Sequence, residues 1–368
     1  MKILHIIYDD ADNPWLGGGG ALRAREINHI LAKENTIIVL TGSFPGARNV
    51  TGNGIRYVRV GAGKNYFLSR FTFMCLIPFY IRKFECDIII NDFSIFSPCF
   101  CQWYSRKPVL HLFHHYLGNQ VFKKFLLLGI FAYFFEKLFL YTAKYLIAVS
   151  PSVAQILRAK GKAREIRCIH NGVDIELFNV PQTNGAYIAF LGRLDTHMKG
   201  LDILLESFSR LSDKTIVLKI AGSGQEKNRT ELEKTIIRLN LDKSVALLGR
   251  ISDYDKKNFL AGSLFLVLPS RFEGWGIAAI EAAACGKAVV GTDIPGLRDA
   301  VVHNKTGILV ESGNVEMLTD AMELLCTDEQ KRKMLGMNGR EWAHNFRWDT
   351  IARKQEEFYR DVIDSGYK

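Results

Sequence analysis

The chain alternates between short apolar runs and longer amphipathic stretches along its whole length. The runs are rich in Ile, Val and Leu, as buried strands are, and the stretches between them space their apolar residues as helices do. Strands are expected at Lys2–Tyr8, Thr36–Thr41, Arg56–Val60, Asp87–Asn91, Pro108–Phe113 and Tyr145–Val149, and again at Ala186–Leu191, Ile216–Ala221, Val245–Leu248, Leu264–Leu268, Ala288–Gly291 and Gly307–Val310. Strands that alternate with helices predict parallel sheets covered on both faces.

The pattern runs twice and breaks once, around residues 171–186, a stretch rich in Asn, Gly, Pro and Thr. We therefore expect an α/β protein of two Rossmann-like, doubly wound domains, residues 1–180 and 181–347, that face each other across a cleft. The last segment, residues 348–368, has the pattern of a polar amphipathic helix, which we expect to pack back on the N-terminal domain. Open parallel sheets bind ligands beyond the carboxyl ends of their strands, so we look for chemistry in those loops.

Composition excludes a disordered or fibrous chain, because 48% of the 368 residues are hydrophobic and 23% are charged. The formal net charge of +10 is unevenly distributed. Residues 1–180 hold 22 Lys and Arg against 12 Asp and Glu, whereas residues 181–368 hold 26 of each. The first half therefore favours an anionic partner, either a nucleic acid or a membrane surface. The seven cysteines form no C-x-x-C pair, which favours reduced thiols in a cytoplasmic protein.

Two apolar, aromatic stretches, Phe71–Ile81 and Phe125–Phe135, lie in the basic half. Each is far shorter than the roughly 20 residues that a membrane-spanning helix needs. The second stretch is flanked by the cations Lys123, Lys124, Lys137 and Lys144. Such segments are either core helices of the first domain or interfacial segments on an anionic leaflet. Nucleic-acid binding is not expected, since the chain carries no recognised motif for it.

Several residues at the ends of expected strands have the chemistry of a phosphate site. Gly17–Gly20 stands between the first strand and the first helix, where close backbone approach and a helix N-terminus suit a phosphate or a flexible loop. It forms neither a G-x-G-x-x-G fingerprint nor a Walker A loop. Arg193 and Lys199 follow a later strand, and the two cations could neutralise a diphosphate leaving group or simply be solvated.

The most informative segment is Pro269–Glu281, which joins the end of a strand to the start of a helix. Its glycines open the helix, so the N–H groups of Gly276 and Ile277 would face a phosphate. Glu273 lies in the loop and Glu281 lies two turns into the helix. A carboxylate on each side could hold sugar and ribose hydroxyls through charge-assisted hydrogen bonds.

Two further groups of residues could hold a metal. His111, His114 and His115 end or follow the strand Pro108–Phe113, but no acid lies nearby in the sequence to complete a site. A buried core position is expected for His111. The segment Asp253–Asp255 has the D-x-D form of a metal motif, and we expect these aspartates to cap a helix instead.

Taken together, the chain resembles a family 4 retaining glycosyltransferase of GT-B fold, a resemblance that spans essentially its whole length. It is carried, in the family's order, by Gly17–Leu22, Ser150–Ser152, Asn171–Asp174, Gly192–Gly200, Gly222–Gly224 and the E-x7-E element Glu273–Glu281.

The resemblance implies roles for individual residues toward a nucleotide-sugar donor. Catalytic roles fall to His114, Glu273, Arg193 and Lys199: Glu273 would hold the sugar, Arg193 and Lys199 the diphosphate, and His114, with His115 as the alternative, would lie at the donor sugar. Glu281 would hold the ribose. The other implied donor-binding residues are Gly18, Gly19, Gly222, Arg250, Ile251, Gly274, Gly276 and Ile277.

The implied activity is transfer of a hexose from a UDP- or GDP-sugar, without a metal cofactor, to a glycan or lipid-linked acceptor in cell-surface polysaccharide or glycolipid synthesis. The expected location is the cytoplasm, at the inner face of the membrane, with an anionic membrane surface as a partner of the basic N-terminal domain. Two alternatives stay open: a nucleotide-sugar epimerase of the same fold, and a non-catalytic donor-binding or scaffold relative.

Overall fold

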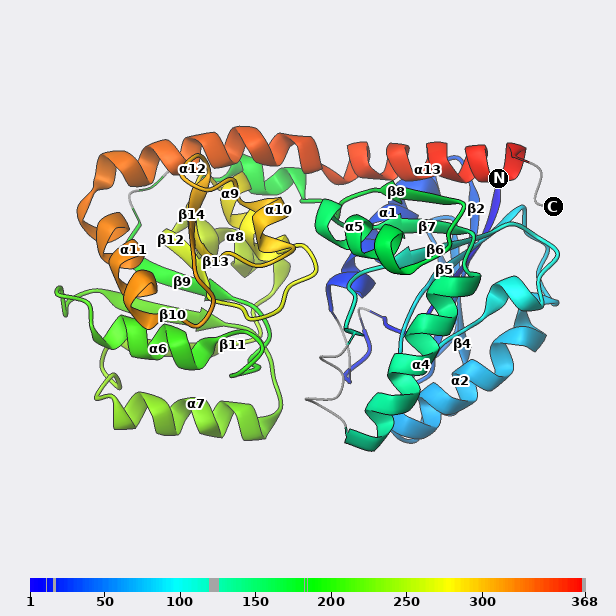
Figure 1. The fold of residues 1–368 in the computed structure, drawn as a ribbon, viewed down its shortest axis with the longest axis horizontal. Coiled ribbons are helices and arrows are strands. Elements are labelled where there is room, and N and C mark those ends of the chain that lie inside the picture. The colour runs from blue at the N-terminus through cyan, green and yellow to red at the C-terminus, as the bar shows by residue number, and fades with distance from the viewer. Residues whose placement is uncertain (11, 16–17, 119–125, 182, 184, 366–368) are drawn as a thin grey trace. The chain divides into compact units, whose positions relative to one another are not determined.

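The computed structural model of the protein describes residues 1–10, 12–15, 18–118, 126–181, 183 and 185–365. The chain divides into two compact units, Met1–Asn171 together with Trp348–Lys368, and Gly172–Arg347 (Figure 1). The division after Asn171 falls earlier in the chain than residue 180, because the loop that follows already contacts the second unit: the Val173 N–H donates to the Phe346 carbonyl at 2.8 Å.

The first unit is an eight-stranded sheet in the order β3-β4-β2-β1-β5-β6-β7-β8. All its neighbouring strands are parallel except β3, which runs antiparallel to β4. The strands are β1 (Lys2–Ile7), β2 (Thr36–Gly42), β3 (Val50–Gly52), β4 (Ile55–Val60), β5 (Ile88–Asp92), β6 (Val109–Phe113), β7 (Tyr145–Ala148) and β8 (Glu165–Cys168). The helices are α1 (Gly19–Leu31), α2 (Tyr66–Ile81), α4 (Leu126–Thr142), α5 (Pro151–Lys160) and α13 (Trp348–Asp364).

The order of the strands decides which helices share a face of this sheet. The connection from β1 through α1 to β2 runs one way along the sheet, whereas the connections through α2, α4 and α5 run the other way. Parallel crossovers are right-handed, so α2, α4 and α5 cover one face and α1 covers the opposite face. Helix α13 packs against α1 and so completes that second layer. Within the described residues, no helix is both long and apolar enough to cross a bilayer.

The second unit is a six-stranded, fully parallel sheet in the order β11-β10-β9-β12-β13-β14. Its strands are β9 (Tyr187–Leu191), β10 (Val217–Ala221), β11 (Val245–Gly249), β12 (Ser263–Leu268), β13 (Ala288–Thr292) and β14 (Gly307–Val310). Its helices are α6 (Leu201–Ser209), α7 (Glu226–Arg238), α8 (Asp253–Ala261), α9 (Ile277–Ala284), α10 (Leu297–Ala300), α11 (Val315–Thr327) and α12 (Glu329–Ala343).

Both sheets confirm the predicted α/β architecture of alternating strands and helices, and two strands were missed. Strand β3 is three exposed residues, and strand β8 is a half-buried edge strand. Neither has the buried apolar run that marks the central strands, such as β5, whose five residues are all buried.

Candidate functional site

The loops that follow β9 and β12 meet at the carboxyl edge of the second sheet, because these two strands are neighbours. The Arg271 N–H donates to the Met198 carbonyl at 3.0 Å and ties the two loops together. Gly200 has a positive φ of 67°, and a Cβ there would lie 2.0 Å from the Pro269 carbonyl oxygen. Only glycine allows this approach, which brings the loop of Arg193 and Lys199 against the loop of Glu273.

Lys199 and Glu273, two residues from separate predicted motifs, form an ion pair across these loops. Each side chain keeps about a fifth of its surface exposed, 21% in both cases. The pair therefore lies at the surface of the edge, where an arriving anion can compete for the lysine. Arg193 is exposed on the same loop.

Arg271 holds the Lys199 loop in place. Its guanidinium donates to both carboxylate oxygens of Asp202, at 2.8 and 2.7 Å, and to the His197 carbonyl at 2.7 Å. A bidentate pair fixes direction as well as distance, so it orients the turn that carries Lys199. The sequence offered no signal for this pair, because its partners are 69 residues apart.

Helix α9 begins at the same edge. Gly276 caps it in the left-handed conformation, with φ 69°, and Ile277 is its first residue. Gly274 lies just before this turn, and Trp275 between them is buried, its ring 5.0 Å from that of Phe346. The buried Trp275 anchors the loop, and the first amides of α9 have no partner one turn back within the helix.

Glu281 lies on α9 and is almost buried. Its carboxylate accepts from the Lys256 ammonium of α8 at 2.6 Å, and Lys256 also reaches Asp253 at 3.3 Å. Burial lowers the pKa of Lys256, but the two carboxylates outweigh it and raise the pKa above its usual value. The ammonium thus stays charged and compensates the buried Glu281. Lys256 was not anticipated as a partner of this residue.

The remaining glycine of this edge has a structural role. At Gly222, φ is 153°, and a Cβ would lie 1.7 Å from the Gly192 carbonyl oxygen. Its N–H donates to the Gly249 carbonyl at 2.8 Å, so this amide is already occupied. Arg250 and Ile251 follow β11 directly, Arg250 exposed and Ile251 half-buried. Gly222 thus lets three strand ends converge beside Arg250.

In the first unit, Gly18 caps α1, which starts at Gly19 with no acidic residue in its first turn. Gly17, the first glycine of this run, lies outside the described residues. A Cβ on Gly20 would lie 3.0 Å from Nε2 of His114, so the imidazole packs against the start of α1. The histidine and the helix N-terminus are therefore neighbours, as a shared anion site would need.

A buried carboxylate holds His114. Asp92, the last residue of β5, contacts His114 Nε2 through Oδ1 at 2.6 Å and His5 Nε2 through Oδ2 at 2.5 Å. Burial alone would raise the pKa of Asp92, but the hydrogen bonds from the two imidazoles outweigh it and hold the pKa well below its usual value. Because a carboxylate only accepts, both imidazoles carry a proton on Nε2.

The chain of contacts continues inward from His5. The amide of Asn28 on α1 lies 2.9 Å from Nδ1 of His5, which completes a row from Asn28 through His5 and Asp92 to His114. The sequence pattern missed Asp92 as a partner of His114 because the two are 22 residues apart. The available signal was that Asp92 ends β5 and His114 directly follows β6, two neighbouring parallel strands whose carboxyl ends share one edge.

The other candidate metal residues do not gather into a site. His111 is fully buried, where burial lowers its pKa to about 3, and its ring lies against Phe139. His115 is exposed. The cap of α8 is Ser252, whose Oγ accepts from the Asp255 N–H at 3.1 Å, so the expectation that an aspartate caps this helix was wrong. Across the described part of the chain, no group of three metal-binding side chains occurs.

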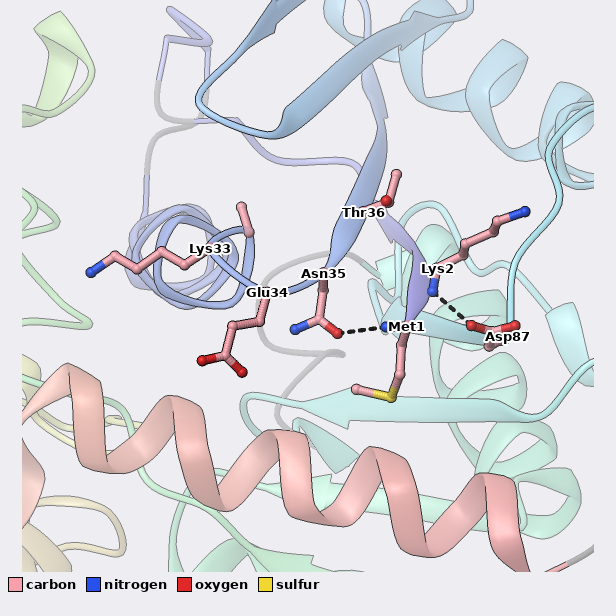
Figure 2. Close-up of a pocket in the computed structure, with 8 residues that line it drawn as sticks. Met1, Lys2, Lys33, Glu34, Asn35, Thr36 and Asp87 are labelled. Carbon is pink, nitrogen blue, oxygen red and sulfur yellow. Dashed lines mark hydrogen bonds between the residues drawn. The ribbon is translucent and has the colours of Figure 1, made fainter.

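A hollow of about 460 Å³ lies at the opposite, amino-terminal edge of the first sheet. Figure 2 shows Met1, Lys2, Asn35, Thr36 and Asp87 around it. The terminal amino group donates to Asn35 at 2.9 Å, and the Lys2 N–H donates to Asp87 at 2.7 Å. These bonds tie down the start of the chain. None of the site residues described above lines the hollow, which lies at the other end of the first sheet from Asp92.

Two parallel-sheet α/β units with this edge chemistry define the GT-B class of glycosyltransferase folds. The model of glycosyltransferase family 4 matches residues 17–177, and that of glycosyl transferases group 1 matches residues 176–342. The chain therefore belongs to the group 1 glycosyltransferases of family 4.

Relatives of this chain include an uncharacterized glycosyltransferase, MJ1178, of Methanocaldococcus jannaschii, which is 33% identical over 60% of each chain. The capsular polysaccharide biosynthesis glycosyltransferase CapM of Staphylococcus aureus is 28% identical over 63% of this chain and 65% of its own. The matches thus span less than two thirds of these relatives. The sucrose-phosphate synthase of Thermosynechococcus elongatus has the same fold, with a TM-score of 0.88 at 24% identity, over 99% of this chain and all of the other.

Proposed function

We propose that this protein transfers a hexose, with retention of configuration, from a nucleotide-diphosphate sugar to a glycan or lipid-linked acceptor. The observation that carries the proposal is the carboxyl edge of the second sheet. There Lys199, Glu273, Arg193 and the start of α9 lie within one pair of joined loops.

The diphosphate of the donor is the group that suits this edge best. Arg193 and Lys199 supply two positive charges, and the amides of Gly276 and Ile277 supply donors at the positive end of a helix. Lys199 is held by Glu273 until a ligand arrives. A diphosphate carries more negative charge than one carboxylate, so it draws the ammonium away from Glu273.

The sugar and the nucleoside then fall to the carboxylates. Once Lys199 turns to the phosphates, Glu273 becomes an acceptor for hydroxyls of the transferred sugar, beside the amide of Gly274. Glu281, already oriented by Lys256, accepts from the ribose hydroxyls. Arg250 and Ile251 provide a surface for the base, while Gly222 shapes the edge. Both UDP and GDP conjugates fit this description.

The first unit carries its own donor-binding residues in this proposal. The amides of Gly18 and Gly19 at the start of α1 assist with phosphate, and His114 contacts the sugar. The hydrogen bond to Asp92 keeps the Nε2 edge of His114 directed inward, which leaves the Nδ1 edge of the ring for a ligand.

In the reaction, the bond between the anomeric carbon and the diphosphate oxygen breaks, and an acceptor hydroxyl forms a bond to that carbon on the same face. Negative charge grows on the departing diphosphate, and Arg193, Lys199 and the α9 amides stabilise it. The acceptor proton passes to the leaving phosphate. No metal is required in this scheme, because the protein's own cations neutralise the leaving group.

The acceptor belongs to a cell-surface polysaccharide or a glycolipid in this proposal, which the similarity to CapM supports. We place this acceptor at the cytoplasmic face of the membrane, whose anionic surface is the proposed partner of the basic first unit. Lys123 and Lys124, which the sequence singles out for that contact, lie outside the described residues.

Calorimetric titration with UDP, GDP, ADP and their sugar conjugates, without metal, tests the donor. We expect one nucleotide to bind and the Glu281→Ala variant to weaken it by about tenfold or more, since hydrogen bonds to a charged group are lost. The exposed Glu231→Ala on α7 serves as the matched control. Binding of none of these nucleotides would favour the scaffold alternative, and release of an epimerised sugar without an acceptor would favour the epimerase.

A further inference from the structure

Helix α2 exposes three of its four phenylalanines and buries two of its polar residues. Phe67, Phe71 and Phe79 are 74%, 61% and 61% exposed, whereas Ser69 and Arg70 are buried. The Ser69 hydroxyl donates to the Ser43 carbonyl at 2.5 Å, and the Arg70 guanidinium donates to Ser94 at 2.9 Å. A surface helix in water has the opposite arrangement, with its polar residues outward. The outer face of α2 is therefore adapted to an apolar surrounding.

Helix α4 has the same inversion. Ile130, Phe131 and Phe134 are exposed, while its acid, Glu136, is buried. The Glu136 carboxylate accepts the N–H groups of Leu117 and Gly118, at 3.0 and 2.8 Å. A buried acid with its own backbone partners leaves only apolar, aromatic and basic side chains for the outer face of this helix.

The two inverted helices cover the same face of the sheet. The direction of their crossovers places both there, and a single loop joins them: Ser97 of this loop accepts from Arg70 of α2, and Ile95 packs against Ala132 of α4. We call the exposed residues Phe67, Phe71, Phe79, Ile130, Phe131 and Phe134 the α2–α4 face. Isolated exposed apolar residues are ordinary, but several large ones on two helices that cover the same face of a sheet indicate a contact surface.

Aromatic residues with polar edges lie beside the α2–α4 face. The Trp103 ring stacks on Phe100, which contacts Phe135 of α4, and Trp103 is 57% exposed. Tyr141, near the end of α4, is 60% exposed and carries the Lys162 ammonium over its ring at 4.2 Å. Trp and Tyr beside apolar residues and lysines are typical of the boundary between lipid and water.

The charge of this region is strongly positive. Residues 64–164 hold 14 Lys and Arg but 4 Asp and Glu. Two of the four acids, Asp92 and Glu136, are buried, and the other two, Glu85 and Asp87, are bonded to Lys2. The exposed cations include Lys64 before α2, Arg82 and Lys83 after it, Lys137 on α4 and Lys144 after α4. The region thus presents cations around an apolar face and almost no free anion.

We propose that the α2–α4 face docks onto an anionic lipid bilayer, with both helices lying on its surface and their phenylalanines entering the boundary between headgroups and acyl chains. Apolar insertion and attraction to anionic headgroups act together, as in other interfacial helices. The inference deepens the membrane partner of the proposed function, on which it rests, by naming the residues that make the contact.

Flotation with vesicles of phosphatidylcholine and phosphatidylglycerol tests this directly, with the full chain and without donor or acceptor. The wild-type protein is expected to bind these vesicles, and the Phe71→Ser/Phe79→Ser/Phe131→Ser/Phe134→Ser variant to lose at least about tenfold in affinity. Ile237→Ser/Met337→Ser is the matched control, because those residues are 68% exposed in the second unit. The control should bind like the wild type, and equal binding by the phenylalanine variant would overturn the proposal.

Charge-reversal variants, together with a measurement of the molecular mass in solution, distinguish binding of lipid from binding of a second copy of the chain. Lys137→Glu/Lys144→Glu should weaken binding about tenfold, whereas Lys227→Glu/Lys234→Glu on α7 should not. A dimer in solution that the phenylalanine variant converts to monomer would assign the face to a second copy and overturn the lipid proposal. Unchanged nucleotide titration of the phenylalanine variant shows that it is folded. A failure of flotation is thereby distinguished from a failure of the donor proposal.

Discussion

The carboxyl edges of the two sheets have the same architecture but handle charge in different ways. In the second unit, Lys199 and Glu273 face each other as long side chains that are each 21% exposed. In the first unit, Asp92 is held between two rigid imidazoles, and the side chains of His5 and Asp92 are only 2% and 5% exposed. The edge of the second unit therefore carries an ion pair that a ligand can separate. The edge of the first unit carries the row of His5, Asp92 and His114, which is held in one arrangement around a buried carboxylate.

The difference follows from the strength of the two kinds of pair. A partly exposed ion pair contributes about 0–1 kcal/mol, so a multiply charged ligand displaces it at little cost. Breaking a buried charged pair costs roughly 3–5 kcal/mol, because it leaves a charge without compensation. We conclude that the second edge is suited to rearrange around a ligand, while the first is suited to hold one imidazole in one orientation.

The largest effect on this comparison is expected from Lys199→Ala. Removing a cation that stabilises a leaving diphosphate should lower kcat by about 10²–10³-fold, while the exposed pair it breaks should leave the thermal unfolding temperature unchanged. Steady-state kinetics and a melting curve measure both, with Lys227→Ala on α7 as control. A large loss of stability with little loss of rate would show that the pair is structural.

Asp92→Asn tests the fixed row. The amide presents an N–H₂ group to one of two nitrogens that each carry a proton, so one imidazole must change tautomer. We expect kcat to fall about tenfold, with a shifted pH profile and an unchanged nucleotide affinity. Asp320→Asn, at an exposed position of α11, provides the comparison. If the variant kept the wild-type pH profile, Asp92 would not orient His114.

The same variant has a consequence for acid stability. The pKa of Asp92 lies below that of an unfolded aspartate, about 3.9, so its carboxylate stabilises the fold above that pH and loses the contribution as the pH falls through its lower folded pKa. The stability that wild type loses between about pH 4 and pH 2 should be smaller in Asp92→Asn. Urea unfolding across this range measures it.

Arg271→Lys should have the smallest effect. Lysine cannot make the bidentate contact with Asp202, so the turn that carries Lys199 loosens without losing a charge. We expect about a threefold rise in KM for the donor, with kcat nearly unchanged. Arg210→Lys, whose arginine pairs with Glu206 on the exposed face of α6, is the control. A fall in kcat alone would mean that Arg271 acts on the reacting groups.

The sequence pattern was sufficient for the central strands and for the motif loops. Strands such as β5 and β12 are buried on both faces, so their apolar runs are continuous and easy to recognise. Strands β3 and β8 lie at the two edges of the first sheet and lack that burial. Their pairing depends on a neighbouring strand rather than on their own composition, which a local pattern does not record.

The partners of the site residues were the harder part. Each partner is far away in the sequence from the residue it contacts and belongs to no motif. These pairs are Lys256 with Glu281, Asp202 with Arg271, and Asp92 with His114 and His5. Helices α2 and α4 show the same limit, because their apolar composition suited core helices and interfacial helices equally. The structure adds which residues of these helices face outward: Arg70 and Glu136 are buried, while Phe71 and Phe131 are exposed.

Gly222 has a consequence for how this family is compared. Any side chain there would collide with the Gly192 carbonyl, so selection should remove substitutions at Gly222 as strictly as substitutions of Lys199. An alignment would then show both positions as invariant, one for chemistry and one for the closeness of two backbones. Invariance alone would place Gly222 among the ligand contacts, although its amide is already bound to Gly249.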